Sequence, residues 1–217
     1  MCELKITAET RVLDIGGTSE FWDLGWGSRF RLPRLVLLNT PRAREEVGGA
    51  IQWVAGDGCS LPFRDGAFDV VFSNSVIEHV GDRASQERFA QEVMRVGRMF
   101  WIQTPNRWFP VEQHLLTPLV HWLPKRWQRA IVPRANLWSV LARVTPDRRR
   151  FYIEHYLHDV RLLNARELGV LFPGARIIHE RFLGMTKSLI AASRAKLPQF
   201  GSSPAPAPNT TRDAPRP

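Results

Sequence analysis

The sequence predicts a doubly wound α/β fold with a mostly parallel sheet of the seven-stranded type. Five short apolar runs rich in β-branched residues are expected to form strands, at residues 11–15, 34–38, 50–55, 68–72 and 98–102. Turn or helical segments separate these runs, and such alternation is typical of parallel strands joined by crossover connections. Strand patterns near the end of the chain predict a closing antiparallel hairpin.

Two helices and the closing hairpin have clear local signals. Apolar residues recur at helical spacing over residues 83–96, with charged residues on the opposite face. Residues 164–172 offer Asn164 as an N-cap and Glu167 three residues later, which is the spacing of a capping box. Two β-rich runs joined by a glycine-containing turn then predict the hairpin over residues 176–192.

The chain of 217 residues is long enough for one well-buried domain that carries an insertion. We assign residues 1–196 to this domain, and residues 105–160 within it to a helical insertion that interrupts the strand rhythm. Residues 197–217 hold six prolines among mostly small and polar residues. This composition predicts a disordered tail.

Small and polar residues follow the predicted strands, at the edge where open parallel sheets bind ligands. Asp14 and the pair Gly16-Gly17 end the first strand, and Gly56-Asp57-Gly58 follows the third. A carboxylate in this place can accept a hydrogen bond from the amino group of a flat heterocycle. Glycines beside it let the backbone approach a ligand closely. The sequence therefore predicts a cofactor site at this edge of the sheet.

Residues 54–80 carry most of the family information, and they read VAGDGCSLPFRDGAFDVVFSNSVIEHV. This stretch resembles the class I S-adenosylmethionine-dependent methyltransferases, in particular the subgroup that includes the ubiquinone- and menaquinone-biosynthesis enzymes. In that subgroup a Gly-Asp pair, Leu-Pro-Phe, Phe-Asp-Val-Val and a final Glu-His recur in this order. The run Asp14-Ile15-Gly16-Gly17-Thr18-Ser19 takes the place of the family's first cofactor motif, with one glycine of the usual set replaced.

The resemblance implies S-adenosyl-L-methionine as the cofactor and assigns roles to individual residues. Asp57 would meet the adenine amino group, and the backbone around Gly58 and Cys59 would line the adenine. Asn39 stands where the family usually has an acid that holds the ribose hydroxyls, and it would accept through its carbonyl oxygen. Asn74 would lie near the methionine half of the cofactor.

Alternatives remain at several of these positions. The pair Gly16-Gly17 also suits a tight strand-to-helix turn without a ligand, and Asn39 also suits a turn cap. A methyl acceptor needs a base only where it must lose a proton. The candidate bases are His79 beside Glu78, His155 beside Glu154, His158 and Tyr156. His79 also suits a hydrogen-bonded structural role, and Glu154-His155 also suits a solvated helix face.

The net charge of +9 and the eight tryptophans point to a partner with negative charge and apolar surface. Residues 105–156 alone hold nine Lys or Arg against three acids. They fit a lid, or a peripheral membrane contact through residues 108–150 with tryptophan at headgroup level. An ordinary packed insertion is the alternative. Nucleic acid is a less favoured candidate partner, because the apolar content of the insertion is high for a groove that binds a phosphate backbone.

No apolar run reaches the roughly 18 residues of a membrane-spanning helix, and the N-terminal residues lack the apolar segment of a signal peptide. The two cysteines, Cys2 and Cys59, are far apart and form no metal-binding pattern. They suit a reducing compartment. We therefore expect a cytoplasmic protein, either free or peripheral to the membrane, with no resident metal.

Three functions follow from these observations. The first is methyl transfer from S-adenosylmethionine to a small-molecule or lipid-like acceptor by in-line displacement. The second is a non-catalytic binding or scaffold protein on a degenerate methyltransferase fold, which the replaced glycine and Asn39 favour. The third is a nicotinamide dehydrogenase, which is disfavoured because Asn39 is not an acid and Gly16-Gly17 lacks the spaced third glycine.

Overall fold

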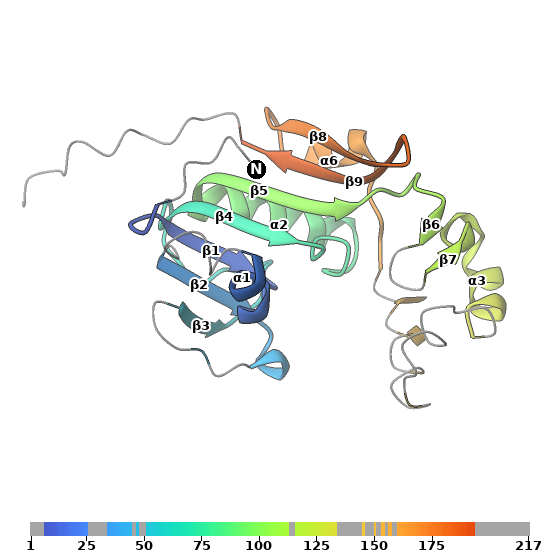
Figure 1. Ribbon diagram of the computed structural model, residues 1–217, viewed down its shortest axis with the longest axis horizontal. Helices are drawn as coiled ribbons and strands as arrows, with labels where there is room; N and C mark the ends of the chain where they lie inside the picture. The colour runs from blue at the N-terminus through green and yellow to red at the C-terminus, as the bar shows by residue number, and fades with distance from the viewer. Residues whose placement is uncertain are drawn as a thin grey trace, which may run out of the picture.

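The computed structural model describes residues 7–25, 34–44, 47, 51–112, 116–133, 145, 150, 153–154, 156–157 and 160–193. Its centre is a seven-stranded sheet with the strand order β3-β2-β1-β4-β5-β9-β8 (Figure 1). The first five strands of the chain pair in parallel, and β9 and β8 add to β5 as an antiparallel pair. The doubly wound sheet with a closing hairpin is therefore confirmed.

The strands lie close to their expected ranges. The parallel strands are β1 Arg11–Ile15, β2 Arg34–Asn39, β3 Ile51–Ala55, β4 Phe68–Asn74 and β5 Gly97–Pro105. The hairpin consists of β8 Arg176–Phe182 and β9 Met185–Ala192. Both β4 and β5 run past their apolar segments, because backbone pairing continues through polar residues such as Thr104, which pairs with Leu189.

Helices α2 and α6 begin close to the expected residues, and each has an N-cap. Helix α2 Arg83–Val96 starts after Asp82, whose carboxylate accepts a hydrogen bond from the Ser85 N–H. Helix α6 Ala165–Leu171 has a complete capping box between Asn164 and Glu167. Helix α1 Ser19–Gly25 follows the glycine pair after β1. After β2, the 3-10 helix η1 Pro41–Ala43 follows.

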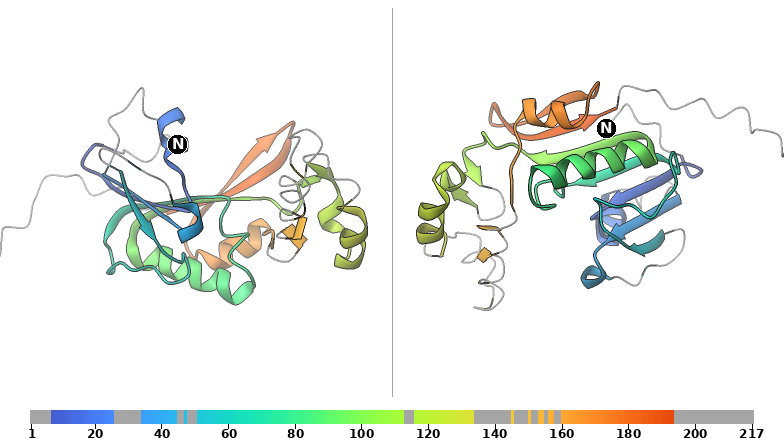
Figure 2. Two further views of the ribbon diagram at one scale, coloured as in Figure 1. Left: turned by 90° about the horizontal axis from the view of Figure 1, so that it is seen from below. Right: turned by 180° about the vertical axis from the view of Figure 1, so that it is seen from behind.

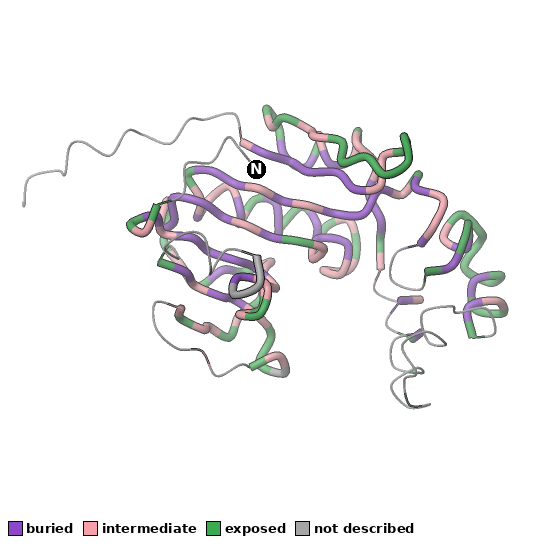
Figure 3. Tube along the Cα trace, viewed as in Figure 1, coloured by how far each residue is buried: buried purple, intermediate pink, exposed green. Residues whose placement is uncertain are grey.

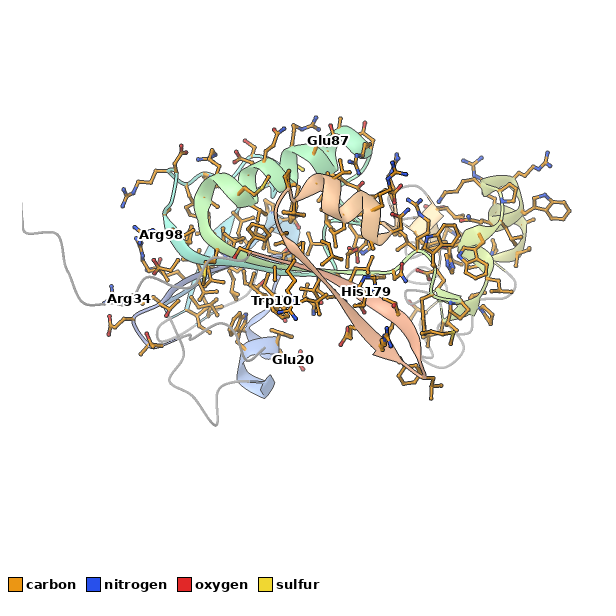
Figure 4. The ribbon with its side chains drawn as sticks, turned by 90° about the horizontal axis from the view of Figure 1, so that it is seen from above. Glu20, Arg34, Glu87, Arg98, Trp101 and His179 are labelled. Carbon is orange, nitrogen blue, oxygen red and sulfur yellow. The ribbon has the colours of Figure 1, made fainter. Side chains whose placement is uncertain are left out.

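Helices cover both faces of the sheet, and each face has its own core. Residues of α2 and α6, including Phe89 and Leu168, pack with Leu13 and Val71 on one face. On the other face, Trp22 of α1 packs with Val12 and other strand residues. The edge-on view in Figure 2 separates these layers, and Figure 4 shows Glu87 on the α2 side and Glu20 on the α1 side. Burial concentrates along the central strands (Figure 3).

The insertion is partly helical and partly extended. Its described elements are strands β6 Val111–Glu112 and β7 Thr117–Pro118, the 3-10 helix η2 Val120–Trp122 and helix α3 Lys125–Ile131. The antiparallel β6–β7 pair was not expected, since two residues per strand are too few to show an alternating pattern. A small core of its own joins Val120 and Val132 to Ile153 and Tyr156.

The proposed tail, residues 197–217, lies outside the described residues. Within the described part of the chain, no helix has the length and apolar character needed to cross a membrane.

Candidate functional site

A cavity of about 790 Å³ opens where β1, β2, β3 and β4 end. Its lining comes from the glycine turn after β1, from residues 38–41 and 55–58, and from the loop that leads from β4 to α2. The carboxyl ends of parallel strands are the usual ligand site of such sheets. The volume lies within the range of small-molecule sites, about 300–1,000 Å³.

The glycine turn between β1 and α1 leaves no room for side chains. Gly16 has a φ of +77°, and a Cβ there would lie 2.4 Å from Val76 Cγ2. Its N–H donates to the Leu38 carbonyl at 2.8 Å, which ties the turn to the tip of β2. A Cβ on Gly17 would lie 1.8 Å from Asp14 Oδ2. Both glycines are therefore required by the packing, and Gly16 also presents bare backbone to the cavity.

Asp14 is buried beneath this turn and does not line the cavity. Its Oδ2 accepts a 2.7 Å hydrogen bond from the Trp22 indole N–H. Its Oδ1 has no hydrogen-bond partner among the described residues. Burial raises the pKa of Asp14 to about 7, although the Trp22 hydrogen bond opposes this shift. Asp14 thus supports the turn from below.

Asn39 lies at the tip of β2 and lines the cavity. Its Oδ1 accepts the Thr40 N–H at 2.8 Å, and its Nδ2 donates to the Gly17 carbonyl at 3.3 Å. The side chain therefore caps its own turn and also joins β2 to the glycine turn. The second lone pair of Oδ1 is still available to a ligand hydroxyl.

Asp57 and Gly58 line the cavity in the turn after β3, and Cys59 does not. Asp57 is exposed, and its Oδ1 accepts the Cys59 N–H at 2.8 Å. A Cβ on Gly58 would lie 2.9 Å from a ring carbon of Phe89, so the backbone here rests directly on the core. The Cys59 thiol donates to the Ser85 carbonyl at 3.3 Å. Burial and the nearby Asp57 raise its pKa to about 11, so the thiol stays protonated at neutral pH.

At the tip of β4, the residue that lines the cavity is not the expected Asn74. Asn74 is exposed and does not line the cavity, whereas Ser75 and Val76 do. Ser75 has a φ of +57°. Its N–H donates to the Gln103 carbonyl, and its hydroxyl donates to Gln103 Oε1. The left-handed backbone at Ser75 turns the chain here, and strand alternation read from the sequence cannot reveal such a turn.

Of the histidine candidates, His79 lines the cavity and is partly buried. Its Nε2 lies 3.9 Å from Oε1 of the buried Glu78, whose Oε2 accepts the Thr104 hydroxyl at 2.9 Å. The other two, His155 and His158, lie outside the described residues. Residues 7–25, 34–44, 51–112 and the other described segments contain no group of three metal-ligating side chains.

The site therefore gathers four of the expected cofactor residues on one cavity, namely Gly16, Asn39, Asp57 and Gly58. The other four, Asp14, Gly17, Cys59 and Asn74, do not line the cavity. Gly17 and Cys59 directly follow lining residues, Asp14 is two positions before Gly16, and Asn74 directly precedes the lining residue Ser75. Exposed backbone, one carboxylate and one amide around an apolar floor suit a flat, polar ligand of nucleoside size.

The strand order and the position of this cavity define a Rossmann-like methyltransferase fold. The sequence model of a family described as a methyltransferase domain matches residues 35–99, which include β2 to the start of β5. A curated protein of Encephalitozoon cuniculi, named as a candidate methyltransferase, is 38% identical over 97 residues. The match covers 42% of this chain and 41% of that protein, so this chain spans less than half the length of that relative.

Two solved structures share the fold at low sequence identity. One comes from the complex between the Haloferax volcanii methyltransferase activator Trm112 and a candidate methyltransferase. Its TM-score is 0.52 at 13% identity, and the match covers 88% of this chain and 84% of that chain. The other is PigF with SAH, which has a TM-score of 0.52 at 15% identity. That match covers 86% of this chain and 56% of that chain. At such identities these likenesses establish the fold.

Proposed function

We propose that this chain transfers a methyl group from S-adenosylmethionine to a small-molecule or lipid-like acceptor by in-line displacement. The observation that carries the proposal is the cavity over the tips of β1 to β4, where Gly16, Asn39 and Asp57 converge. Much of its lining belongs to the segment that matches a methyltransferase domain.

The residues present fit an adenosyl cofactor. Gly16 and Gly58 line the cavity without a side chain, and a Cβ at either position would clash with Val76 or Phe89. A ligand at these two positions therefore meets bare backbone. Asp57 would accept from the adenine amino group, and Asn39 from a ribose hydroxyl. The bound cofactor would supply an electrophilic methyl group on a sulfonium. The chain itself must orient the acceptor in line with that group and exclude water.

A proton on the acceptor would pass to His79, the described histidine that lines the cavity. Glu78 Oε1 lies 3.9 Å from His79 Nε2, and Glu78 Oε2 accepts the Thr104 hydroxyl, so a fixed carboxyl group lies beside the imidazole. An acceptor without an ionisable proton would need no such base.

Composition and resemblance support the proposed class of acceptor. The likeness of residues 54–80 to quinone-biosynthesis methyltransferases, together with the basic and tryptophan-rich insertion, supports an apolar acceptor with a negative group. The described part of the insertion does not line the cavity. Arg161, the residue just after the insertion, links the insertion to the site. Its N–H donates to the Glu78 carbonyl at 2.8 Å.

Calorimetry with S-adenosylhomocysteine tests the proposal. We expect binding by the wild type, and Asp57→Ala should weaken it by about 1–3 kcal/mol through loss of the carboxylate acceptor. The control is Asp65→Ala, which removes an exposed turn carboxylate outside the cavity lining, at the turn before β4. Equal affinity of Asp57→Ala and wild type would contradict the assigned role of Asp57.

A scaffold function is the second candidate, because Oδ1 of Asn39 already accepts a backbone N–H and a family glycine is replaced. It predicts a folded wild-type protein that fails to bind S-adenosylhomocysteine. The same titration therefore separates the two functions.

A further inference from the structure

Large apolar side chains are exposed on the insertion. Among the described residues, Trp108 is 63% exposed, Trp127 is 54% and Leu119 is 48%. Trp122 and Leu123 are also exposed, and the Trp122 ring centroid lies 6.3 Å from that of Trp108. Tryptophan and leucine are usually buried, and an exposed cluster of them marks an interaction surface.

The turn of the β8–β9 hairpin adds a second exposed apolar group. Leu183 is 82% exposed at its tip, between the exposed Phe182 and Met185. This turn and α3 lie at the same end of the molecule in the views of Figures 1 and 2. Asn106, at the start of the insertion, joins the two parts, because its side chain donates to the Thr186 carbonyl at 2.9 Å.

Three exposed leucines in this region have left-handed backbone conformations. The φ angles are +50° at Leu116, +56° at Leu119 and +47° at Leu183. Such angles are costly for bulky side chains, and Asn or Gly would adopt them more easily. Leu183 precedes Gly184 in a tight hairpin turn, where Asn-Gly is the favoured pair. Residues held in such conformations by the surrounding structure cluster at functional sites.

Positive charge lies beside the apolar side chains of the insertion. Lys125, Arg126 and Arg129 are exposed on α3, and the sequence has no Asp or Glu from residue 116 to 133. Exposed tryptophans and leucines combined with cations, without acids, complement the headgroup region of an anionic bilayer.

We propose that residues 116–129, Trp108 and the β8–β9 turn dock the protein on the surface of an anionic phospholipid bilayer. The tryptophans and leucines enter the interface between headgroups and acyl chains. Arg126 and Arg129 meet the phosphate groups. This surface lies apart from the cofactor cavity lining and does not depend on the proposed methyl transfer.

Vesicle flotation of the full-length chain tests the proposal. We expect binding to vesicles of phosphatidylcholine mixed with phosphatidylglycerol, weaker binding to phosphatidylcholine alone, and loss of binding at high salt. Trp127→Gln should weaken binding about tenfold, and Arg126→Gln or Arg129→Gln about fivefold each. Quenching of tryptophan fluorescence by brominated lipid should be strong in the wild type. A wild type that remains unbound with both vesicle types overturns the proposal.

Leu183→Asn separates docking from folding. Asn tolerates the left-handed backbone, so this variant should melt at or above the wild-type temperature and still bind anionic vesicles severalfold more weakly. The matched control is Val170→Asn, which changes an exposed apolar residue of α6 and should bind vesicles like the wild type. Wild-type affinity of both Leu183→Asn and Trp127→Gln would overturn the proposal. So would sedimentation showing that this surface joins two copies of the chain, with Trp127→Gln releasing monomers.

Discussion

Trp22 donates its indole N–H to Asp14 Oδ2 at 2.7 Å, and this bond fixes a buried carboxyl under the glycine turn that borders the cavity. Burial raises the pKa of Asp14 from 3.8 to about 7. The folded protein therefore holds a proton at this site over a pH range in which the unfolded chain has released it. A carboxyl in this position couples the stability of the turn to pH.

Asp14→Asn should remove this pH dependence. Because the pKa of Asp14 is raised on folding, its contribution to stability is fully present below about pH 4 and is lost as the pH rises through about 7. This contribution to the free energy of unfolding is on the order of 4 kcal/mol. The amide oxygen can still accept from Trp22, and it does not titrate. Denaturant unfolding across this pH range should give a flatter profile for the variant and a more stable variant at pH 8. Parallel profiles for the two proteins would contradict the assignment.

Gly17→Ala should destabilise the protein and weaken S-adenosylhomocysteine binding. The added Cβ would lie 1.8 Å from the Asp14 carboxylate, and the buried surroundings leave little room to relax. Overpacking of this kind costs about 1–3 kcal/mol. Denaturant unfolding and calorimetry measure the two effects.

The control for this variant is Gly169→Ala. Its Cβ would lie 3.8 Å from Ile177, an ordinary contact, and helix α6 should gain about 0.5–1 kcal/mol. If both glycine variants changed stability in the same direction, the steric argument at Gly17 would not hold.

The sequence was sufficient for the strands, for α2 and for α6, because their signals are local. Apolar runs marked all five parallel strands, and Asn164 with Glu167 marked the start of α6. The strand order and the outcome at Asn74 and Ser75 depend on backbone geometry that residue types do not encode. The hydrogen bond from Asn39 Nδ2 to the Gly17 carbonyl joins two turns that are 22 positions apart, and no local pattern predicts it.

Gln86 is a buried polar residue that sequence periodicity does not distinguish from an apolar one. Its Nε2 donates to the carbonyls of Ile77 at 3.1 Å and Arg161 at 3.0 Å. It thereby joins α2 to the loop that carries His79 and to the chain that returns from the insertion. The side chain is fully buried, so these bonds are shielded from water.

Gln86→Met should therefore lower the free energy of unfolding by about 1–3 kcal/mol, because two carbonyls lose their donor. Hydrogen exchange should also become faster at the His79 amide, whose N–H donates to the Val76 carbonyl. The matched control is Gln91→Met on the exposed face of the same helix, with a change within about 0.5 kcal/mol. Similar losses in both variants would mean that the bonds of Gln86 contribute little.

His79→Gln should separate catalysis from cofactor binding. The ring borders the cavity and lies 3.9 Å from Glu78, whereas the residues assigned to the adenosine are Asn39 and Asp57. Loss of a general base slows proton transfer by about 10²–10⁴-fold, and Gln can fill the same space without accepting the proton. The measurement is transfer of a labelled methyl group into a lipid extract, beside calorimetry with S-adenosylhomocysteine. We expect the affinity to stay within about twofold of the wild type while the transfer rate falls at least about a hundredfold. A variant with the wild-type rate would show that the acceptor gives up no proton to His79, and a variant that loses cofactor affinity would place His79 among the binding residues instead.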